Sequence, residues 1–493
     1  MDTLLDKKRY FSARERSIIY LIYNGKCDFC KVSLRDSFHV DHRIPHSKLG
    51  RTTLANAVAL CGRCNLVKSD QLSYDYAMRT WQIAALNQTV EVAASGGQVF
   101  VTNACPGAGK TRYAISFLDW ALDTEFADLI IYCSPSVELR DDVADRVEEF
   151  TKFKLSKVID GSSFERVLVD GVPSRVSGFS ITYQTLKSRY AVISALCERK
   201  KVVMICDEVH HAGLERSWGD AVKEASSSAQ FRLGMSGTPF RSDDVQIAFL
   251  NYDGAQGLPE YNFFYGQALA KGYVAPVQFS FRNALIRLVD PRAGDTPITL
   301  ELRQDHGDSE GIKLRGAYAE GSRYSEAIIE QANAHLKSLH PTDGAAAGLV
   351  IASNISHADR IADYIRNTLN ERCEIVHSDQ DNRDKIKKFK KNKDQWIVSV
   401  GMISEGVDIP RLRVLVFLSA VTTRLYFHQA VGRVVRLHHQ NKTHLEQSGF
   451  IYLPPTPAFM ELAAEFEDEI LHILGDDAPE PNANRVGDRE GNN

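Results

Sequence analysis

The chain has 493 residues, of which 44% are hydrophobic and 25% are charged. This composition is typical of a globular protein with about three domains, and it excludes a collagen-like or a wholly disordered chain. The formal charge is −4, and the sequence has no uninterrupted apolar run of roughly 18 residues. We therefore expect a cytoplasmic protein with no membrane partner.

The charge is unevenly distributed along the chain. Residues 1–80 contain 14 Lys or Arg against 8 Asp or Glu, whereas residues 456–493 contain 2 against 10. The basic end favours contact with a polyanion such as nucleic acid, and the acidic end would repel one. We expect residues 457–493 to form an acidic, partly disordered tail, because the final segment GDDAPEPNANRVGDREGNN has little apolar surface to bury.

Two C-x-x-C pairs lie near the N-terminus. They are Cys27 with Cys30 and Cys61 with Cys64, separated by 30 residues. Four thiolates at this spacing can enclose a tetrahedral Zn²⁺, and so small a module needs such a metal to fold. A purely structural zinc site is the simplest interpretation. The odd number of cysteines argues against a disulfide framework.

The sequence between and just after these pairs contains HVDHRIPHSKLG and NAVALCGRCNLVKSD. Over residues 24–72 it resembles the HNH nucleases, which have a ββα-metal fold. The resemblance implies that His42 is the general base for the attacking water, that Asp41 and Asn65 hold a catalytic Mg²⁺ or Mn²⁺, and that Asn56 braces the loop. Asn65 stands where many members have a third histidine. The alternative is a degenerate zinc module that only binds DNA.

After residue 80, short apolar runs alternate with longer amphipathic segments, which is the pattern of a parallel sheet with crossover helices. The first set of predicted strands comprises residues 97–104, 128–135, 179–185, 201–208 and 231–237. The second set comprises residues 348–354, 374–378, 395–400, 414–419 and 449–455. Residues 284–320, between the sets, have weak periodicity and are expected to be a connector or insertion.

The first predicted strand runs into CPGAGKT and then into an amphipathic segment, which is the context of a phosphate-binding loop. Gly107 and Gly109 allow backbone N–H groups to surround the β-phosphate of ATP, at the N-terminus of the following helix. Lys110 would contact the β- and γ-phosphates, and Thr111 would ligate Mg²⁺. Position 104 is Ala, where the strict pattern has Gly.

A second acidic motif follows the predicted strand VVMIC. Asp207 is placed to bind Mg²⁺, and Glu208 is placed to orient the hydrolytic water. A pair of solvated acids at a strand end is the simpler alternative. Further motifs in the expected order argue against that alternative: MRTWQ, YCSPSVEL, ITYQTL, MSGTPF, SEGVDIP and HQAVGRVVR.

Together these motifs, across residues 78–455, resemble superfamily 2 helicases, closest to the DNA-translocase branch that includes restriction-enzyme motor subunits. The resemblance assigns Gln82 to adenine recognition, and Ser236 and Thr238 to coupling hydrolysis with domain motion. It also assigns residues to the interface between two motor domains and to the γ-phosphate: Glu405, Gly406, Asp408, Gln429, Gly432, Arg433 and Arg436.

We therefore predict an α/β protein with two RecA-like parallel-sheet domains, preceded by a small ββα-metal (HNH) zinc module. The predicted boundaries are 1–75 for the HNH module, 76–283 for the first motor domain, 284–335 for the connector, 336–456 for the second motor domain and 457–493 for the tail.

The predicted function is an ATP-dependent DNA helicase or translocase fused to an HNH endonuclease, acting on single- or double-stranded DNA. Its cofactors would be ATP, Mg²⁺ (or Mn²⁺) and Zn²⁺. Phage defence, phage replication and repair are associated with such fusions, and the sequence does not choose among them or name a protein partner. The alternatives are a DNA translocase whose HNH module only binds DNA, and an RNA-remodelling ATPase.

Overall fold

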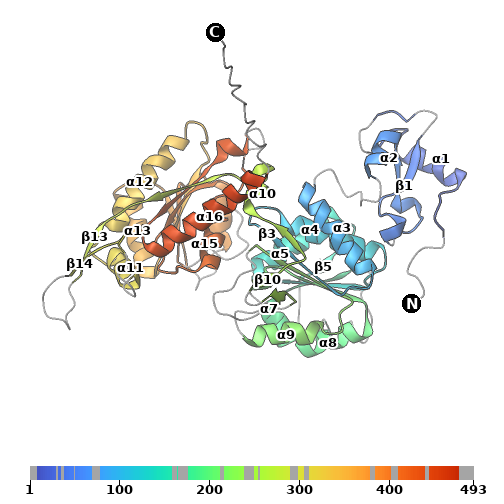
Figure 1. The fold of residues 1–493 in the computed structure, drawn as a ribbon, viewed down its shortest axis with the longest axis horizontal. Helices are drawn as coiled ribbons and strands as arrows, with labels where there is room; N and C mark the ends of the chain where they lie inside the picture. The colour runs from blue at the N-terminus through green and yellow to red at the C-terminus, as the bar shows by residue number, and fades with distance from the viewer. Residues whose placement is uncertain are drawn as a thin grey trace, which may run out of the picture.

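The computed structural model shows three folded parts that follow one another along the long axis of the molecule (Figure 1). The described residues are 8–28, 32–34, 38–48, 50–68, 78–157, 164, 176–210, 216–237, 249–253, 256–288, 298–304, 310–377, 383–400, 409–438 and 443–476. Within these ranges, no helix is both long enough and apolar enough to cross a membrane.

The N-terminal module is a two-stranded antiparallel sheet flanked by two helices. Its elements are α1 (Ala13–Ile22), β1 (His39–His42), the short 3₁₀ helices η1 (His46–Lys48) and η2 (Leu54–Asn56), β2 (Ala57–Leu60) and α2 (Gly62–Lys68). The register pairs His39 with Leu60 and His42 with Ala57. The module has a small core that includes Ile19, Leu34 and Val58, so it depends on more than apolar burial to stay folded. The predicted ββα arrangement is confirmed.

The first motor domain contains a seven-stranded sheet in which every neighbouring pair is parallel. Its strand order is β11 (Tyr261–Phe263), β3 (Val99–Ala104), β8 (Phe231–Ser236), β7 (Val202–Cys206), β4 (Leu129–Ser134), β6 (Gly178–Thr182) and β5 (Leu155–Ser156). The helices are α3 (Thr80–Ala94), α4 (Lys110–Asp123), α5 (Val137–Phe150), α7 (Tyr183–Ser188), α8 (Tyr190–Arg199) and α9 (Arg216–Ser226).

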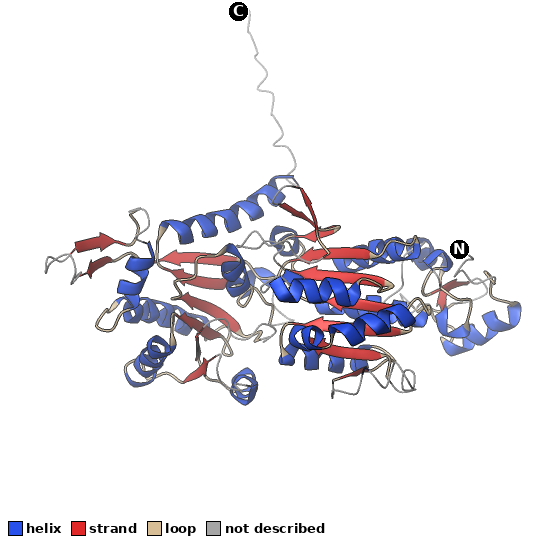
Figure 2. Cartoon of the chain, turned by 90° about the horizontal axis from the view of Figure 1, so that it is seen from below, coloured by secondary structure: helices blue, strands red, loops and turns tan. Residues whose placement is uncertain are grey.

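Alternate residues of the central strands pack on opposite faces of this sheet. In β4, Ile130 and Tyr132 join the core beneath α3 and α4, whereas Ile131 and Cys133 join the core beneath α8 and α9. Both faces are therefore apolar and covered by helices, as Figure 2 shows. This arrangement explains why the strands read as continuous apolar runs.

The second motor domain contains a six-stranded, wholly parallel sheet. Its strand order is β12 (Val277–Phe281), β19 (Gly449–Leu453), β18 (Leu412–Phe417), β15 (Ala347–Ala352), β17 (Trp396–Val400) and β16 (Cys373–His377). Its helices and 3₁₀ turn are α11 (Glu310–Tyr318), α12 (Tyr324–Leu339), α13 (Ile355–Asn367), α14 (Arg383–Lys391), α15 (Arg424–Val431), η4 (His444–Gln447) and α16 (Pro457–Asp476). All ten predicted strands coincide with observed strands.

Three segments differ from the sequence interpretation. Residues 277–281, which the predicted boundary places in the first motor domain, form β12 and pair with β19 of the second sheet. The predicted connector contains the hairpin of β13 (Leu285–Leu288) and β14 (Ile298–Glu301), which projects at the far end of the second domain (Figures 1 and 2). The first 20 residues of the predicted tail form α16, and residues 477–493 lie outside the described part of the chain.

Smaller elements complete the first domain and its junction with the second. They are the hairpin of β9 (Asn251–Asp253) with β10 (Gln256–Leu258) and the helix α10 (Tyr265–Ala270), which follows β11. The helix α10 packs against α16, and Tyr265 and Phe466 have ring centroids 4.6 Å apart. A helix at the end of the second domain therefore packs against the segment that joins the two domains.

Candidate functional sites

The phosphate-binding loop connects β3 to α4 and turns on two glycines. Gly107 has φ of 81° and Gly109 has φ of 91°, both in the left-handed region that favours glycine. A Cβ on Gly109 would lie 2.8 Å from Nε2 of Gln82, so a larger residue would displace the side chain that donates to the Gly109 carbonyl. The loop therefore needs glycine at position 109 for both conformation and space.

Side chains at the N-terminal end of α3 hydrogen-bond to the backbone of this loop. Three side chains donate hydrogen bonds to consecutive loop carbonyls: Arg79 to Gly107 (2.7 Å), Trp81 to Ala108 (3.0 Å) and Gln82 to Gly109 (2.7 Å). The Arg79 guanidinium also lies over the ring of Tyr273, 5.0 Å from its centroid. Sequence reasoning identified only Gln82, because Arg79 and Trp81 precede it in MRTWQ without a recognisable role of their own.

The two acids at the end of β7 face the loop. Tyr132 donates to Oδ2 of Asp207 (3.0 Å). The pKa of Asp207 is raised to about 6, mainly by burial and also by the charge of Glu208, while Lys110 acts in the opposite direction. Glu208 has φ of 47°, and its Oε1 lies 3.1 Å from Nζ of Lys110. The lysine that would contact phosphate is thus paired with the acid that would orient water.

Residues of the second motor domain complete a cleft of about 330 Å³ around the loop. Its lining from the second domain comprises Pro410, Gln429, Gly432, Arg433, Arg436 and Leu437. A Cβ on Gly432 would lie 2.4 Å from Cβ of Pro106, so the two domains are in direct contact here. The cleft also contains Lys110, Thr111, Asp207 and Glu208. Thr238, Glu405, Gly406 and Asp408 lie outside the described residues.

A histidine links the acids to the second domain. Gln429 donates from Nε2 to Nε2 of His210 (3.1 Å), so His210 donates from Nδ1 to the hydroxyl of Ser236 (2.9 Å). His210 is fully buried, and it was not assigned a role from the sequence. Its place in DEVH, two residues after Glu208, was the available signal.

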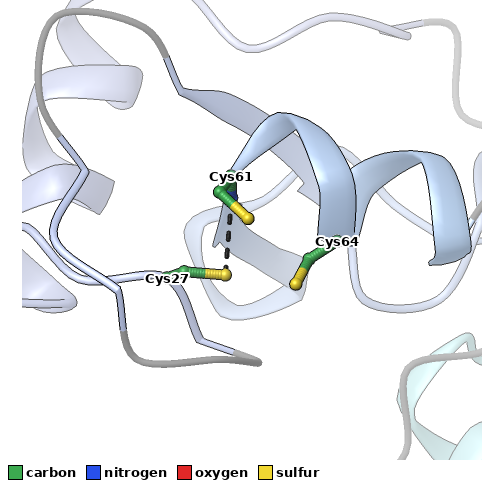
Figure 3. Close-up of side chains that lie close together, drawn as sticks. All are labelled: Cys27, Cys61 and Cys64. Carbon is green, nitrogen blue, oxygen red and sulfur yellow. Dashed lines mark hydrogen bonds between the residues drawn. The ribbon is translucent and has the colours of Figure 1, made fainter.

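The predicted zinc ligands converge in the N-terminal module. The sulfur atoms of Cys27, Cys61 and Cys64 lie within 4.8 Å of one another (Figure 3), and the backbone N–H of Cys61 donates to Sγ of Cys27 (3.4 Å). Cys30 lies outside the described residues. Three thiols within reach of one ion fit Zn²⁺, which prefers thiolate ligands.

The candidate nuclease site lies at the end of β1 and on α2. Oδ1 of Asp41 accepts from the backbone N–H of His42 (2.8 Å), and Oδ2 accepts from Nζ of Lys68 (2.8 Å). The Lys68 side chain is only 1% exposed. An ionised carboxylate offers about four lone-pair sites, so Asp41 still has capacity for a divalent ion. Asn65 lies three residues before Lys68, on the same face of α2.

The side chain of His42 is 9% exposed. Its Nδ1 lies 4.0 Å from Oδ1 of Asp41, and its Nε2 lies 2.9 Å from the hydroxyl of Thr52. Sequence reasoning assigned no role to Lys68 or Thr52. The i, i+3 spacing of Asn65 and Lys68 on a helix could have identified the first, and no sequence signal identified the second.

Residues 43–48 and 50–52 form a connection that includes η1 and begins directly after the site. Asn56 ties this loop together: its Oδ1 accepts from the N–H of Ile44 (2.7 Å), and its Nδ2 donates to the carbonyls of Ile44 (3.0 Å) and Arg51 (2.9 Å). A Cβ on Gly50 would lie 1.8 Å from the carbonyl oxygen of Ile44, so only glycine fits there.

The same loop docks the module on the first motor domain. Trp120 of α4 donates to the carbonyl of Lys48 (2.9 Å), and Lys48 donates to Asn87 of α3 (2.6 Å). Arg51 forms a two-bond ion pair with Glu125, at 2.8 and 2.5 Å. Ile44 is 3% exposed and belongs to the core cluster of the motor domain. The nuclease loop and the two helices nearest the nucleotide cleft are therefore in contact.

Comparisons with known proteins agree with these three parts. The HNH endonuclease family matches residues 27–71, the family described as type III restriction enzyme, res subunit, matches residues 75–241, and the helicase conserved C-terminal domain matches residues 331–438. The chain is a superfamily 2 helicase with an N-terminal HNH endonuclease domain, and this prediction is confirmed.

The chain belongs to the same family as an uncharacterized protein of Mycobacterium leprae (strain TN). The two are 30% identical over 419 residues, which cover 83% of this chain and 67% of the relative.

Two solved structures share the fold. A fragment of a putative HsdR subunit of a type I restriction enzyme from Vibrio vulnificus YJ016 has a TM-score of 0.54 and 18% identity, covering 79% of this chain and 66% of that chain. The ATP-dependent type ISP restriction-modification enzyme LlaBIII, bound to DNA, has a TM-score of 0.52 and 15% identity, covering 81% of this chain and 30% of that chain.

Proposed function

We propose that this chain is an ATP-driven DNA helicase or translocase whose HNH module cleaves DNA with the help of a divalent ion. The observation that carries the proposal is the nucleotide cleft, which is built from both motor domains. A cleft of this kind closes and opens with the nucleotide state, which is the requirement for a motor. Asp41 and His42 belong to the HNH module, which docks on that motor through Lys48.

In the proposed hydrolysis, Lys110 leaves its contact with Glu208 and binds the phosphates of ATP instead. The Glu208 carboxylate is then available to orient the attacking water. Mg²⁺, held by Thr111 and Asp207, would neutralise charge on the phosphates. Arg433 and Arg436 supply positive charge from the second domain. Because these arginines reach the phosphates only when the domains meet, hydrolysis depends on closure.

In the proposed cleavage, His42 accepts the proton of the attacking water. A divalent ion, held by the oxygen donors of Asp41 and Asn65, would stabilise the charge on the scissile phosphate. Lys68 orients the Asp41 carboxylate through its 2.8 Å contact with Oδ2.

DNA is the substrate class that the features favour. The basic N-terminal residues suit a polyanion, and LlaBIII, which has the same fold, is described as bound to DNA. A second candidate function, in which the HNH module only binds DNA, is favoured by the burial of His42 and by the occupation of one Asp41 oxygen by Lys68.

Cleavage of supercoiled and linear DNA by the full chain, with Mg²⁺ or Mn²⁺ and with or without ATP, decides between these functions. We expect His42→Ala to lower cleavage by about 10²-fold or more, while DNA-stimulated ATP hydrolysis stays within a few-fold of the original rate. The matched control is His39→Ala, which removes an exposed histidine from the same strand. Equal cleavage by the His42→Ala and His39→Ala proteins would leave the DNA-binding alternative.

ATP hydrolysis by the same protein tests whether DNA or RNA is the substrate. DNA and RNA of equal length are compared as activators of ATP hydrolysis. Stronger stimulation by RNA would contradict the DNA assignment.

A further inference from the structure

A buried chain of hydrogen bonds leads from the proposed general base to the N-terminal segment. Nε2 of His42 lies 2.9 Å from the hydroxyl of Thr52, and that hydroxyl in turn bonds the backbone carbonyl of Lys8. Thr52 is 5% exposed and His42 is 7% exposed, so water competes little for these bonds. Such contacts decide which nitrogen of a histidine carries its proton.

The direction of each bond follows from the number of protons. A carbonyl oxygen only accepts, so the single proton of the Thr52 hydroxyl points to Lys8. The oxygen of Thr52 therefore accepts from His42, and Nε2 of His42 must carry a proton. In the neutral ring, the lone pair then resides on Nδ1.

The ring orientation places Nδ1 on the side of the proposed metal ligand. Nδ1 lies 4.0 Å from Oδ1 of Asp41, the oxygen that also accepts from the His42 backbone N–H. The ring of Phe11 packs against the imidazole at 4.8 Å, with the planes at 41°, and the ring of His46 lies 5.9 Å away. Rotating the imidazole by 180° would replace Nε2 by a carbon opposite Thr52 and break the chain.

Thr52 is itself held on both sides. The carbonyl of Arg51, the residue before it, accepts from Nδ2 of Asn56 (2.9 Å), and the backbone N–H of Thr53, the residue after it, donates to the same carbonyl (3.0 Å). The Thr52 hydroxyl therefore has a defined position relative to β1, which a residue in an unanchored loop would lack.

We propose that Thr52 is a positioning residue for DNA cleavage: it keeps the proton on Nε2 of His42, so that Nδ1 is the nitrogen that accepts a proton from the attacking water. This inference rests on the proposed nuclease function. It assigns a role to Thr52, which lies within the HNH match but has none of the roles that the family resemblance assigns, and it identifies the reactive nitrogen.

The test compares Thr52→Val with Thr52→Ser in the full chain, using steady-state cleavage of DNA over a range of DNA concentrations. Valine keeps the shape of threonine and removes the hydroxyl, whereas serine keeps the hydroxyl and removes the methyl group. We expect the valine variant to lose roughly 10- to 100-fold in kcat with KM for DNA unchanged, as for other residues that orient a catalytic group. The serine variant should stay within about 3-fold of the original rate.

A residue that serves only packing gives the opposite order, with valine tolerated and serine impaired, and that result would overturn the inference. Thr53→Val is the control for losing a hydroxyl in the same loop, and it should affect kcat less than Thr52→Val. If the original protein fails to cleave, or cleaves without His42, the proposed nuclease function fails. If cleavage needs His42 and the valine variant cleaves normally, only the role of Thr52 fails.

A spectroscopic measurement tests the proton position without cleavage. Long-range ¹H–¹⁵N correlation spectra of the full chain labelled at histidine, with the His42 signal assigned by the His42→Ala variant, should show the pattern of an Nε2-protonated neutral ring. An Nδ1-protonated pattern would overturn the inference even if the Thr52 variants do not fold.

Discussion

At the residue scale, Glu208 combines an unusual backbone with a central position. Its φ of 47° lies in the left-handed region that a glutamate rarely adopts, and this conformation directs Oε1 to Lys110 and Oε2 to the N–H of Gly237 (3.3 Å). Strain of this kind persists where surrounding contacts fix it, and such positions cluster at active sites. The geometry therefore supports a catalytic use of this carboxylate rather than a solvated strand end.

We predict that Glu208→Gln lowers DNA-stimulated ATP hydrolysis by about 10²-fold or more and leaves ATP binding intact. The amide has the same size but cannot activate water as a carboxylate does, and the glycines of the loop are untouched. Hydrolysis is measured by phosphate release, and binding by a fluorescent nucleotide. Hydrolysis at the original rate would remove Glu208 from the mechanism.

Asp119, on α4, is a half-buried carboxyl outside both proposed sites. Burial raises the pKa of Asp119 to about 6, Asp123 adds to the rise, and nearby basic side chains, including Arg43 of the HNH module, oppose it. The folded state therefore binds the carboxyl proton of Asp119 more tightly than the unfolded chain does. The contribution of this proton to the free energy of unfolding is complete below about pH 4. The contribution is lost as pH rises through about 6.

We therefore predict that Asp119→Asn raises the melting temperature by a few degrees at pH 8 and gives no gain at pH 4. The asparagine avoids a buried charge only where the aspartate would be ionised. The control is Asp363→Asn, at an exposed carboxyl on α13. A gain of equal size at both pH values would show that burial of the charge is not the cause.

At the scale of secondary structure, the sequence predicted the central strands well because their two faces are both apolar. Ile130, Ile131 and Tyr132 are all fully buried, so β4 reads as one continuous apolar run. Edge strands lack this signal. Residues 277–281 are only partly buried, and their assignment to the second sheet depends on pairing with β19, more than 160 residues later in the chain.

The helix α16 was missed for a different reason, since its acidic composition concealed its periodicity. Phe459, Leu462, Ala463 and Phe466 are buried and recur at the spacing of one helical face, whereas Glu461, Glu465, Glu467 and Asp468 are exposed. Phe466 contacts Tyr265 of α10, and its ring lies 5.9 Å from that of Phe279. The net charge of a segment is therefore a poor guide to whether it is folded.

We predict that Phe466→Ala destabilises the second motor domain by about 3–5 kcal/mol, the usual cost of removing a buried aromatic ring. Glu467→Ala, one residue later on the exposed face, should change stability by about 0.5 kcal/mol or less. Unfolding in urea is followed by hydrogen exchange of the backbone amides of β15 and β18, which lie in that domain. Equal stability of the two variants would mean that α16 is not part of the fold.

At the scale of the whole molecule, the motifs predicted which residues belong to each site but not how the sites lie relative to one another. Each motif is local, whereas the docking contacts join residues more than 70 positions apart: Lys48 to Trp120, and Arg51 to Glu125. The same limit applies within the nucleotide cleft, where His210 connects Ser236 to Gln429 of the other domain. Such pairs depend on tertiary packing, which a single sequence does not display.

The docking contacts differ in strength, and this difference decides how to disrupt them. The Arg51–Glu125 pair is exposed, with side chains 49% and 65% accessible, so it contributes about 0–1 kcal/mol. The bond from Trp120 to Lys48 and the burial of Ile44 are shielded from water and contribute more. Removing the ion pair alone should therefore leave the module docked.

A stronger change places two positive charges opposite Lys48 and Arg51, the basic residues through which the HNH module docks. We predict that the double variant Asn87→Arg/Glu125→Arg, which alters only the motor domain, detaches the HNH module, because the new guanidinium groups face Lys48 and Arg51. Hydrogen exchange of residues 44–51 should increase. ATP hydrolysis should stay within a few-fold of the original rate, because Lys110, Asp207 and Glu208 are unchanged.

The expected effect of this double variant on DNA cleavage depends on whether docking holds the nuclease in the path of the DNA. If the motor moves DNA past a nuclease held against α3 and α4, the detached module keeps its basal cleavage and loses any stimulation by ATP. Gln88→Arg is the matched control, since it adds one positive charge to the exposed face of the same helix next to Asn87 and should preserve both docking and stimulation. ATP-stimulated cleavage by a double variant whose loop exchanges freely would show that motor and nuclease cooperate only through the DNA.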